Sequence, residues 1–194
     1  MPMNVAIQET MAAVEQFIAQ HQDANPLPRA AAQYVHALLL AVRARHAVEI
    51  GTSYGYSGLW IAAALEGADG EAGRLITIER ERRKSDIAAT YFGQAGLAAR
   101  IQIRNGMAAE ILPTLPGPIE FVLNDADKHL CRQYVELLLP KLSPRAVIVT
   151  DNVLTHADEL AEFLAWLRTH PAFFSTPVPV GNGMELSVYL GSQR

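Results

Sequence analysis

The sequence predicts an α/β protein with a doubly wound, mostly parallel sheet that ends in an antiparallel pair of strands. Five short apolar segments between residues 46 and 152 each precede a segment of helical character, the pattern of a parallel sheet covered on both faces. Near the C-terminus, two strand-like segments flank the turn GNG at residues 181–183, which predicts a hairpin. The composition, 50% hydrophobic and 19% charged over 194 residues, is that of a soluble globular protein.

Two helices are predicted to precede the sheet. Apolar residues recur at helical spacing through residues 3–20 and again from about residue 29 to 43. The segment HQDANPLPR separates the two helices because it carries two prolines and several polar residues. The five predicted parallel strands are residues 46–51, 74–79, 101–105, 119–125 and 146–152. The helices that follow them, in the same order, are residues 57–65, 80–94, about 107 onward, 129–141 and 157–168. The two hairpin strands are residues 173–180 and 184–190.

The chain is predicted to form one domain over residues 1–194, because this length suffices to bury a full core and no repeat or linker interrupts it. Residues 1–43 supply the N-terminal helices of this domain, and residues 44–194 supply the α/β core.

Charge and cysteine content narrow the classes of partner and compartment. The net charge of −4 gives no basis for a nucleic-acid partner. Cys131 is the single cysteine, so no internal disulfide can form and a reducing compartment is expected. The N-terminus does not resemble a signal peptide, and no apolar run of about 18 residues suggests a membrane span. We therefore expect a cytoplasmic protein without a membrane partner.

The junction of the first strand and its helix reads AVEIGTSYGYSG, residues 47–58. In open α/β sheets, ligands bind beyond the carboxyl ends of the strands. Gly51, Gly55 and Gly58 would let a ligand approach the backbone, and the helix start near Ser57 offers free N–H groups. The alternative is a tight strand–helix turn with Ser57 as the N-cap. The spacing does not match the G-x-G-x-x-G dinucleotide pattern.

Glu79 ends the second predicted strand, so its carboxylate lies at the same edge of the sheet. A carboxylate there can accept hydrogen bonds from both hydroxyls of a ribose. The alternative is a charge at a helix start, which the helix dipole favours.

Acidic and amide side chains follow the fourth and fifth strands, in the segments NDADK and TDN. If these strands are neighbours, Asp125, Asp127, Asp151 and Asn152 come close together. Carboxylates gathered in this way repel one another unless a cation is present. Two carboxylates and an amide oxygen suit Mg²⁺, although Asp and Asn are also common as helix caps.

Lys128 lies three residues after Asp125, next to the predicted metal site. A nearby divalent cation would disfavour the ammonium form, which predicts a lowered pKa and a role as general base. The alternative is a solvated surface lysine.

Taken together, the chain resembles the cation-dependent class I O-methyltransferases, the family that includes catechol and caffeoyl-CoA O-methyltransferases. The resemblance covers roughly residues 30–190 and rests on EIGTSYGYS, the strand-end Glu79, NDADK, TDNVL and the GNG turn, in this order. It is closest to bacterial members. It implies a seven-stranded, Rossmann-like sheet whose last strand is antiparallel.

The same resemblance implies S-adenosylmethionine as the cofactor, with Lys128 as the catalytic residue and Asp125, Asp151 and Asn152 as ligands of Mg²⁺ or another divalent cation. The small residues of the glycine loop would leave room for the methionine part of the cofactor. The residues that it assigns to the cofactor are Glu49 at the amino acid end, Gly51, Ser53, Gly55 and Ser57 in the glycine loop, Glu79 at the ribose, Gly106 and Ala108 at the adenine, and Asp125.

The expected activity is metal-assisted methyl transfer to a hydroxyl of a small, catechol-like aromatic acceptor. Ser53 and Tyr54 stand where family members often carry threonine and an aromatic residue, and the usual glutamine- and glycine-rich substrate segment is not evident around PLPRAAAQ. THADELAEF replaces the tryptophan- and glycine-rich loop common in plant and animal members. These departures lie in regions that recognise the acceptor, so the resemblance does not identify the acceptor. The resemblance suggests a homodimer, with the N-terminal helices as the candidate contact. The alternatives are a metal-independent methyltransferase, a non-catalytic binding module on this fold, and a nicotinamide-dependent oxidoreductase.

Overall fold

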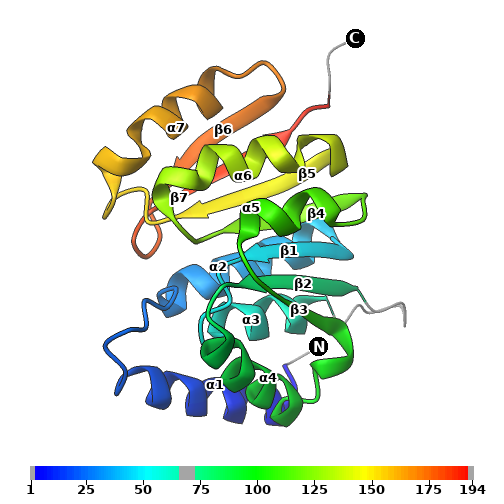
Figure 1. Cartoon of the computed structure of the whole chain (residues 1–194), viewed down its shortest axis with the longest axis vertical. Helices are drawn as coiled ribbons and strands as arrows, with labels where there is room; N and C mark the ends of the chain where they lie inside the picture. The colour runs from blue at the N-terminus through cyan, green and yellow to red at the C-terminus, as the bar shows by residue number, and fades with distance from the viewer. Residues whose placement is uncertain (1–2, 66–72, 192–194) are drawn as a thin grey trace.

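A computed structural model describes residues 3–65 and 73–191 of the chain. The domain predicted over residues 1–194 also includes residues 1–2, 66–72 and 192–194, which lie outside the described residues. Within the described part, a single seven-stranded sheet is covered by helices, which confirms the predicted fold class (Figure 1).

The helices are α1 (Val5–Ile18), α2 (Arg29–Val42), α3 (Tyr56–Ala64), α4 (Arg82–Gln94), α5 (Ala108–Ile111), α6 (Cys131–Leu138) and α7 (Ala157–Thr169), with 3₁₀ turns η1 (Ala98–Arg100), η2 (Leu112–Thr114), η3 (Lys128–Leu130) and η4 (Leu139–Lys141). The strands are β1 (His46–Ile50), β2 (Arg74–Glu79), β3 (Ile101–Asn105), β4 (Ile119–Asn124), β5 (Leu142–Asp151), β6 (Phe173–Val178) and β7 (Met184–Tyr189). None of the described helices is long and apolar enough to cross a membrane.

The strands lie in the order β3-β2-β1-β4-β5-β7-β6. β1 to β5 are parallel, whereas β7 is antiparallel to both β5 and β6, as predicted for the C-terminal hairpin. The chain moves outward from β1 through β2 to β3 and then returns to place β4 on the other side of β1. This reversal of strand order creates a crevice beyond the carboxyl ends of β1 and β4.

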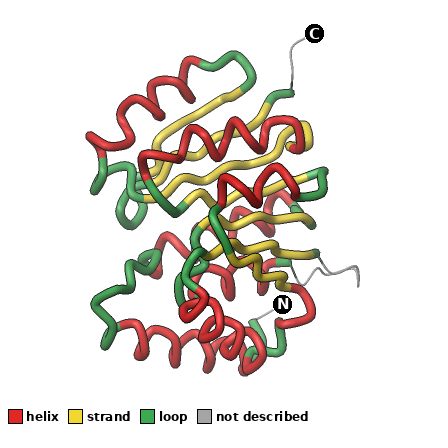
Figure 2. Tube along the Cα trace, in the orientation of Figure 1, coloured by secondary structure: helices red, strands yellow, loops and turns green. Residues whose placement is uncertain are grey.

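An apolar core lies on each face of the sheet. Successive residues of a strand point to opposite faces, and in β1 Ala47 joins one core while Val48 joins the other. Leu59 of α3 belongs to the first core, which also includes residues of α2 and α4, and Val135 of α6 belongs to the second, with residues of α5 and α7. Figures 1 and 2 show the helices in two layers around the sheet, and α1 packs against α3 and α4. Both faces are therefore closed, and the strand ends remain available for a ligand.

The helix predicted over residues 129–141 is shorter than expected. Only α6 is α-helical, and it is flanked by the 3₁₀ turns η3 and η4. Pro140 lies in η4, where it lacks a backbone N–H and cannot continue the α-helix. The helix therefore ends before this residue.

Candidate active site

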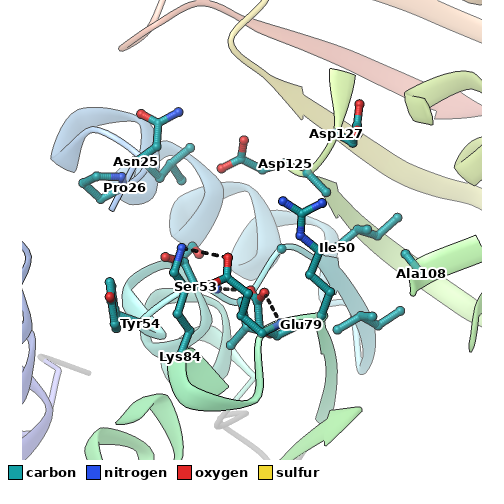
Figure 3. A pocket seen from close by; sticks show the side chains of 18 of the residues that line it. Asn25, Pro26, Ile50, Ser53, Tyr54, Glu79, Lys84, Ala108, Asp125 and Asp127 are labelled. Atoms are coloured by element: carbon teal, nitrogen blue, oxygen red, sulfur yellow. Dashed lines mark hydrogen bonds and ion pairs between the residues drawn. The ribbon is translucent and has the colours of Figure 1, made fainter. Parts of the chain in front are cut away.

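A cleft of about 420 Å³ opens at the crevice between β1 and β4. Figure 3 shows Ser53 and Glu79 on one side of it and Asp125 and Asp127 on the other, with Ala108 at one end. Of the residues predicted from the sequence as functional, those lining the cleft are Gly51, Ser53, Ser57, Glu79, Gly106, Ala108, Asp125, Asp127 and Lys128. Glu49, Gly55, Asp151 and Asn152 do not line it.

Gly51, the first residue after β1, is in a backbone conformation that side chains rarely adopt, with φ at 105°. A Cβ atom at this position would run into the backbone carbonyl of Asp125, which follows β4. The register explains this proximity, because Ile50 pairs with Asn124 and the residues that follow the two strands lie side by side. Gly51 is therefore required for the close approach of the two strand ends.

We expect Gly51→Ala to lower the free energy of unfolding by about 2–6 kcal/mol, combining about 1–3 for backbone strain with about 1–3 for overpacking. Gly96→Ala is the matched control, because Gly96 also has a positive φ (71°) but a Cβ there would meet nothing within 4 Å. The control should lose only about 1–2 kcal/mol. Urea unfolding of both variants measures the difference, and equal losses would contradict the close approach at Gly51.

The other two glycines of the loop make room for an aromatic ring. A Cβ atom at Gly55 or at Gly58 would lie 2.8–2.9 Å from the ring of Phe92 on α4. Gly55 is also the N-cap of α3, with φ at 88°, so the alternative prediction that Ser57 is the N-cap was wrong. Ser57 is the second residue of the helix, and its side chain is buried at the base of the cleft.

Glu49 lies beneath the glycine loop and is fully buried. Its Oε2 accepts a hydrogen bond of 2.6 Å from the Thr77 hydroxyl, whereas Oε1 has no hydrogen-bond partner among the described residues. Burial raises the pKa of this carboxyl to about 7, although the nearby Ser57 hydroxyl and the hydrogen bond from Thr77 lower it; the nearby carboxylates of Asp125 and Glu79 raise it further. Glu49 therefore lies buried behind the wall of the cleft and does not line it.

The Glu79 carboxylate accepts hydrogen bonds from the backbone of two loops, the glycine loop after β1 and the segment after β2. Oε2 accepts a hydrogen bond of 2.8 Å from the Ser53 N–H, and Oε1 accepts one of 2.9 Å from the Glu81 N–H. A carboxylate offers about four lone-pair positions, so each oxygen can accept a further hydrogen bond. The side chain is 8% exposed and faces the cleft, where it can accept from a diol while it holds the glycine loop.

The ends of β4 and β5 bring Asp125, Asp151 and Asn152 together, as the sequence predicted. Asp125 Oδ1 accepts hydrogen bonds of 2.9 Å from both the Lys128 ammonium and the Asn152 amide nitrogen. Asp127, which was predicted to join this cluster, instead caps η3 by accepting a hydrogen bond of 3.1 Å from the His129 backbone N–H. The cluster thus consists of two carboxylates, one amide and one lysine.

The buried carboxyl of Asp151 has the environment expected of a cation ligand. Oδ1 of Asp151 is buried and has no hydrogen-bond partner among the described residues. Burial raises the pKa of Asp151 to about 7, and the carboxylate of Asp125 raises it further. No group of three or more His, Cys, Asp or Glu side chains that could hold a metal exists within the described residues, so the third oxygen would have to come from the amide of Asn152. In the structure this amide presents its nitrogen to Asp125, and it would have to turn over to offer its oxygen.

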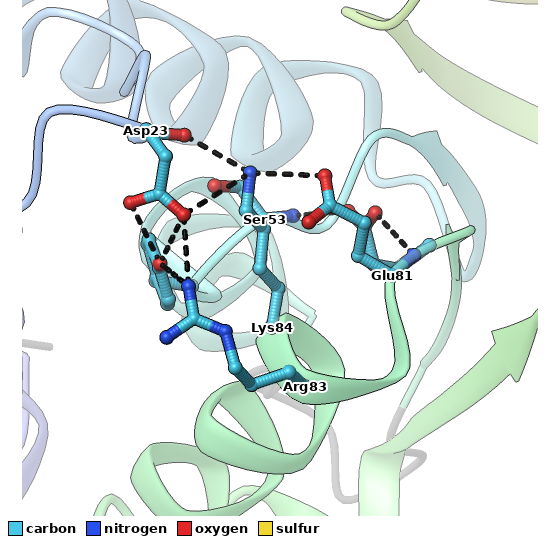
Figure 4. A network of polar contacts seen from close by, with 7 residues as sticks. Asp23, Ser53, Glu81, Arg83 and Lys84 are labelled. Atoms are coloured by element: carbon cyan, nitrogen blue, oxygen red, sulfur yellow. Dashed lines mark hydrogen bonds and ion pairs between the residues drawn. The ribbon is translucent and has the colours of Figure 1, made fainter.

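The sequence did not identify the loop between α1 and α2 as part of the site. Asp23 in this loop accepts hydrogen bonds from the Tyr54 hydroxyl at 2.9 and 3.0 Å and from Arg83 Nη2 at 2.9 Å. Lys84 Nζ donates to the Asp23 backbone carbonyl at 3.0 Å (Figure 4). This network fixes the α1–α2 loop against the glycine loop and α4, and the loop supplies Asn25 to the wall of the cleft.

Residues 3–163 match a family model described as O-methyltransferase. The chain belongs to this O-methyltransferase family. It is 37% identical over 146 residues to a catechol O-methyltransferase of Mycobacterium tuberculosis, in an alignment that covers 72% of this chain and 64% of the relative. The chain thus spans slightly less than two thirds of the length of this relative.

Solved structures of O-methyltransferases share the fold. The O-methyltransferase TomG of Streptomyces achromogenes, solved in complex with SAM, is 30% identical and superposes with a TM-score of 0.81 over 97% of this chain and 91% of the neighbour. An O-methyltransferase of Bacillus cereus, in complex with SAH, is 26% identical, with a TM-score of 0.82 over 97% and 92%. Membership of the O-methyltransferase family confirms the resemblance drawn from the sequence motifs.

Proposed function

We propose that this member of the O-methyltransferase family transfers the methyl group of S-adenosylmethionine to a hydroxyl of a small, catechol-like aromatic acceptor, with the help of a divalent cation such as Mg²⁺. One observation carries the proposal: Asp125 contacts both Lys128 and Asn152 at one end of a cleft whose other walls are the glycine loop and Glu79. The name of the mycobacterial relative and the SAM and SAH complexes of the structural neighbours support it.

The cofactor would occupy the part of the cleft between the glycine loop and β3. Glu79 would accept hydrogen bonds from the ribose hydroxyls, and the segment after β3, which includes Gly106 and Ala108, would border the adenine. Ser57 lies in the first turn of α3, where backbone N–H groups without helical partners favour a carboxylate. The sulfonium of the cofactor supplies the electrophilic methyl group, so the chain has to align the acceptor with it.

Asp125, Asp151 and Asn152 would hold the cation. The buried Oδ1 of Asp151, which has no hydrogen-bond partner among the described residues, and the nearby carboxylate of Asp125 fit a hard divalent ion, which prefers oxygen ligands. When bound, such an ion lowers the pKa of a hydroxyl and stabilises the negative charge that remains after deprotonation.

Lys128 would take the proton from the acceptor hydroxyl as a neutral amine, a form that a divalent cation held beside Asp125 would favour by disfavouring the ammonium. Its ammonium is 2.9 Å from Asp125 Oδ1, and its side chain is only 9% exposed although it lines the cleft. A proton acceptor has to reach the reacting oxygen directly or through one water. A lysine held at the rim of the carboxylate cluster meets this requirement for a hydroxyl bound beside Asp125.

The cofactor assignment predicts that Glu79→Gln weakens the binding of S-adenosylhomocysteine about 10- to 150-fold, because an amide replaces a charged acceptor of the ribose hydroxyls. Calorimetric titration with S-adenosylhomocysteine measures this change. Mg²⁺ affinity should stay within about threefold, since Glu79 would share no ligand with the cation. Asp86→Asn, which removes an exposed charge of α4, is the control and should leave both affinities unchanged. An unchanged cofactor affinity in Glu79→Gln would leave this residue with only its structural contacts to Ser53 and Glu81.

A further inference from the structure

His156 lies at the cleft beside the cluster of Asp125, Asp151 and Asn152, in the loop that joins β5 to α7. The backbone N–H of His156 donates a hydrogen bond of 2.9 Å to the backbone carbonyl of Asn152. The same loop is fixed to the turn of the C-terminal hairpin, because Leu154 N donates to the Asn182 carbonyl at 3.0 Å. The imidazole is therefore supported by an ordered backbone next to the site where the acceptor is expected to bind.

The carboxylate of Glu159 holds this imidazole. His156 Nδ1 lies 2.7 Å from Glu159 Oε1, and His129 Nε2 lies 3.5 Å from the other carboxylate oxygen. The hydrogen bond with His156 lowers the pKa of Glu159, so this carboxyl is ionised and can only accept. In this contact the proton is on His156 Nδ1, because the carboxylate has none to donate, and Nε2 of a ring with a single proton is then a hydrogen-bond acceptor.

A role in starting α7 explains only part of this arrangement. His156 is the N-cap residue, and Glu159 lies in the first turn, where the helix dipole favours a carboxylate. This role requires neither that the imidazole line the cleft nor that Nε2 remain unused. Within the described part of the chain, no hydrogen bond involves His156 Nε2.

We propose that His156 is a specificity-determining residue, whose Nε2 accepts a hydrogen bond from the second hydroxyl of a vicinal-diol acceptor. This inference rests on the proposed function. In such an acceptor, one hydroxyl gives its proton to Lys128, and the neighbouring hydroxyl keeps its proton and needs an acceptor when it leaves water. Lys128 and His156 both line the cleft next to Asp125, so the two hydroxyls would face these two side chains.

The test measures ligand binding rather than turnover, in the presence of S-adenosylhomocysteine and Mg²⁺. Binding of 4-nitrocatechol and of 4-nitrophenol is followed by their absorbance changes in wild type, His156→Ala and His156→Gln. We expect His156→Ala to weaken 4-nitrocatechol about 3- to 10-fold, the value of one neutral hydrogen bond, and to change 4-nitrophenol by less than about twofold. His156→Gln, whose side-chain carbonyl can accept the same hydrogen bond, should recover part of the loss.

His46→Ala is the matched control, because His46 is also an exposed imidazole beside a glutamate, Glu120, but begins β1 at the opposite edge of the sheet. It should leave both ligands unaffected. Equal weakening of both ligands in His156→Ala, no weakening of either, or no binding of 4-nitrocatechol by wild type would overturn the inference. Wild type that binds 4-nitrocatechol but never methylates a diol would instead disprove the proposed function and leave the binding role of His156 supported.

Discussion

Asp151→Ala is expected to lower kcat/KM for a catechol acceptor by at least about 100-fold. Residues that only support metal ligands cost up to about 100-fold when they are replaced, and a direct ligand should cost at least as much. Asp151 is 1% exposed, and its Oδ1 has no hydrogen-bond partner among the described residues, so removing this oxygen breaks no hydrogen bond within that part of the chain. The loss should therefore come from weaker cation binding and not from unfolding. Steady-state turnover over a range of Mg²⁺ concentrations, together with calorimetric titration of Mg²⁺, measures both quantities.

Asp158→Ala is the control for loss of a carboxylate, because Asp158 is an exposed residue in the first turn of α7. It should retain the turnover and the Mg²⁺ affinity of wild type. Thermal unfolding of Asp151→Ala without added metal should resemble that of wild type. Full turnover by Asp151→Ala would rule out this residue as a ligand of an essential cation.

Lys128→Met is expected to lower kcat by about 100-fold or more, the usual scale for the loss of a general base. The affinity for S-adenosylhomocysteine should stay within about twofold, because Lys128 pairs with Asp125, and no hydrogen bond or ion pair among the described residues joins it to Glu79 or the glycine loop. Rapid-quench measurement of a single turnover separates the chemical step from product release.

Lys128→Arg distinguishes proton transfer from charge pairing. A guanidinium can still pair with Asp125, but it does not give up its proton at neutral pH and so cannot serve as a base. We expect this variant to be about as slow as Lys128→Met. Recovery of most of the activity in Lys128→Arg would mean that the positive charge, and not the exchange of a proton, is what the reaction requires.

The arrangement of strand ends could be predicted from the sequence because it depends on a general property of parallel sheets. Alternating apolar segments and helices indicated five parallel strands, and the carboxyl ends of parallel strands meet at one edge. Glu79 and Asp151 each end a strand, and Asp125 comes directly after one, so the order of the strands places all three at this edge of the sheet. The contacts of Asp125 with Lys128 and Asn152 agree with that prediction.

The loops of the site could not be predicted in the same way, because their contacts join segments without periodic patterns. Asp23 and Tyr54 are 31 residues apart, and only the folded chain brings the α1–α2 loop onto the glycine loop. His156 was absent from the predicted site because a single histidine at a helix start has no distinctive spacing. The backbone partners of Glu79 were missed for a related reason, since they depend on how the chain turns after β1 and β2.

The central claim, methyl transfer that depends on a divalent cation, is tested most directly by turnover of the wild-type protein with S-adenosylmethionine and a panel of catechols and phenols, with Mg²⁺ and with excess chelator. We expect methylated product from at least one catechol in the presence of Mg²⁺, and loss of this product with the chelator that is reversed when Mg²⁺ is restored. Equal turnover with and without the chelator, or no methylation of any acceptor by protein that binds S-adenosylmethionine, would contradict the claim.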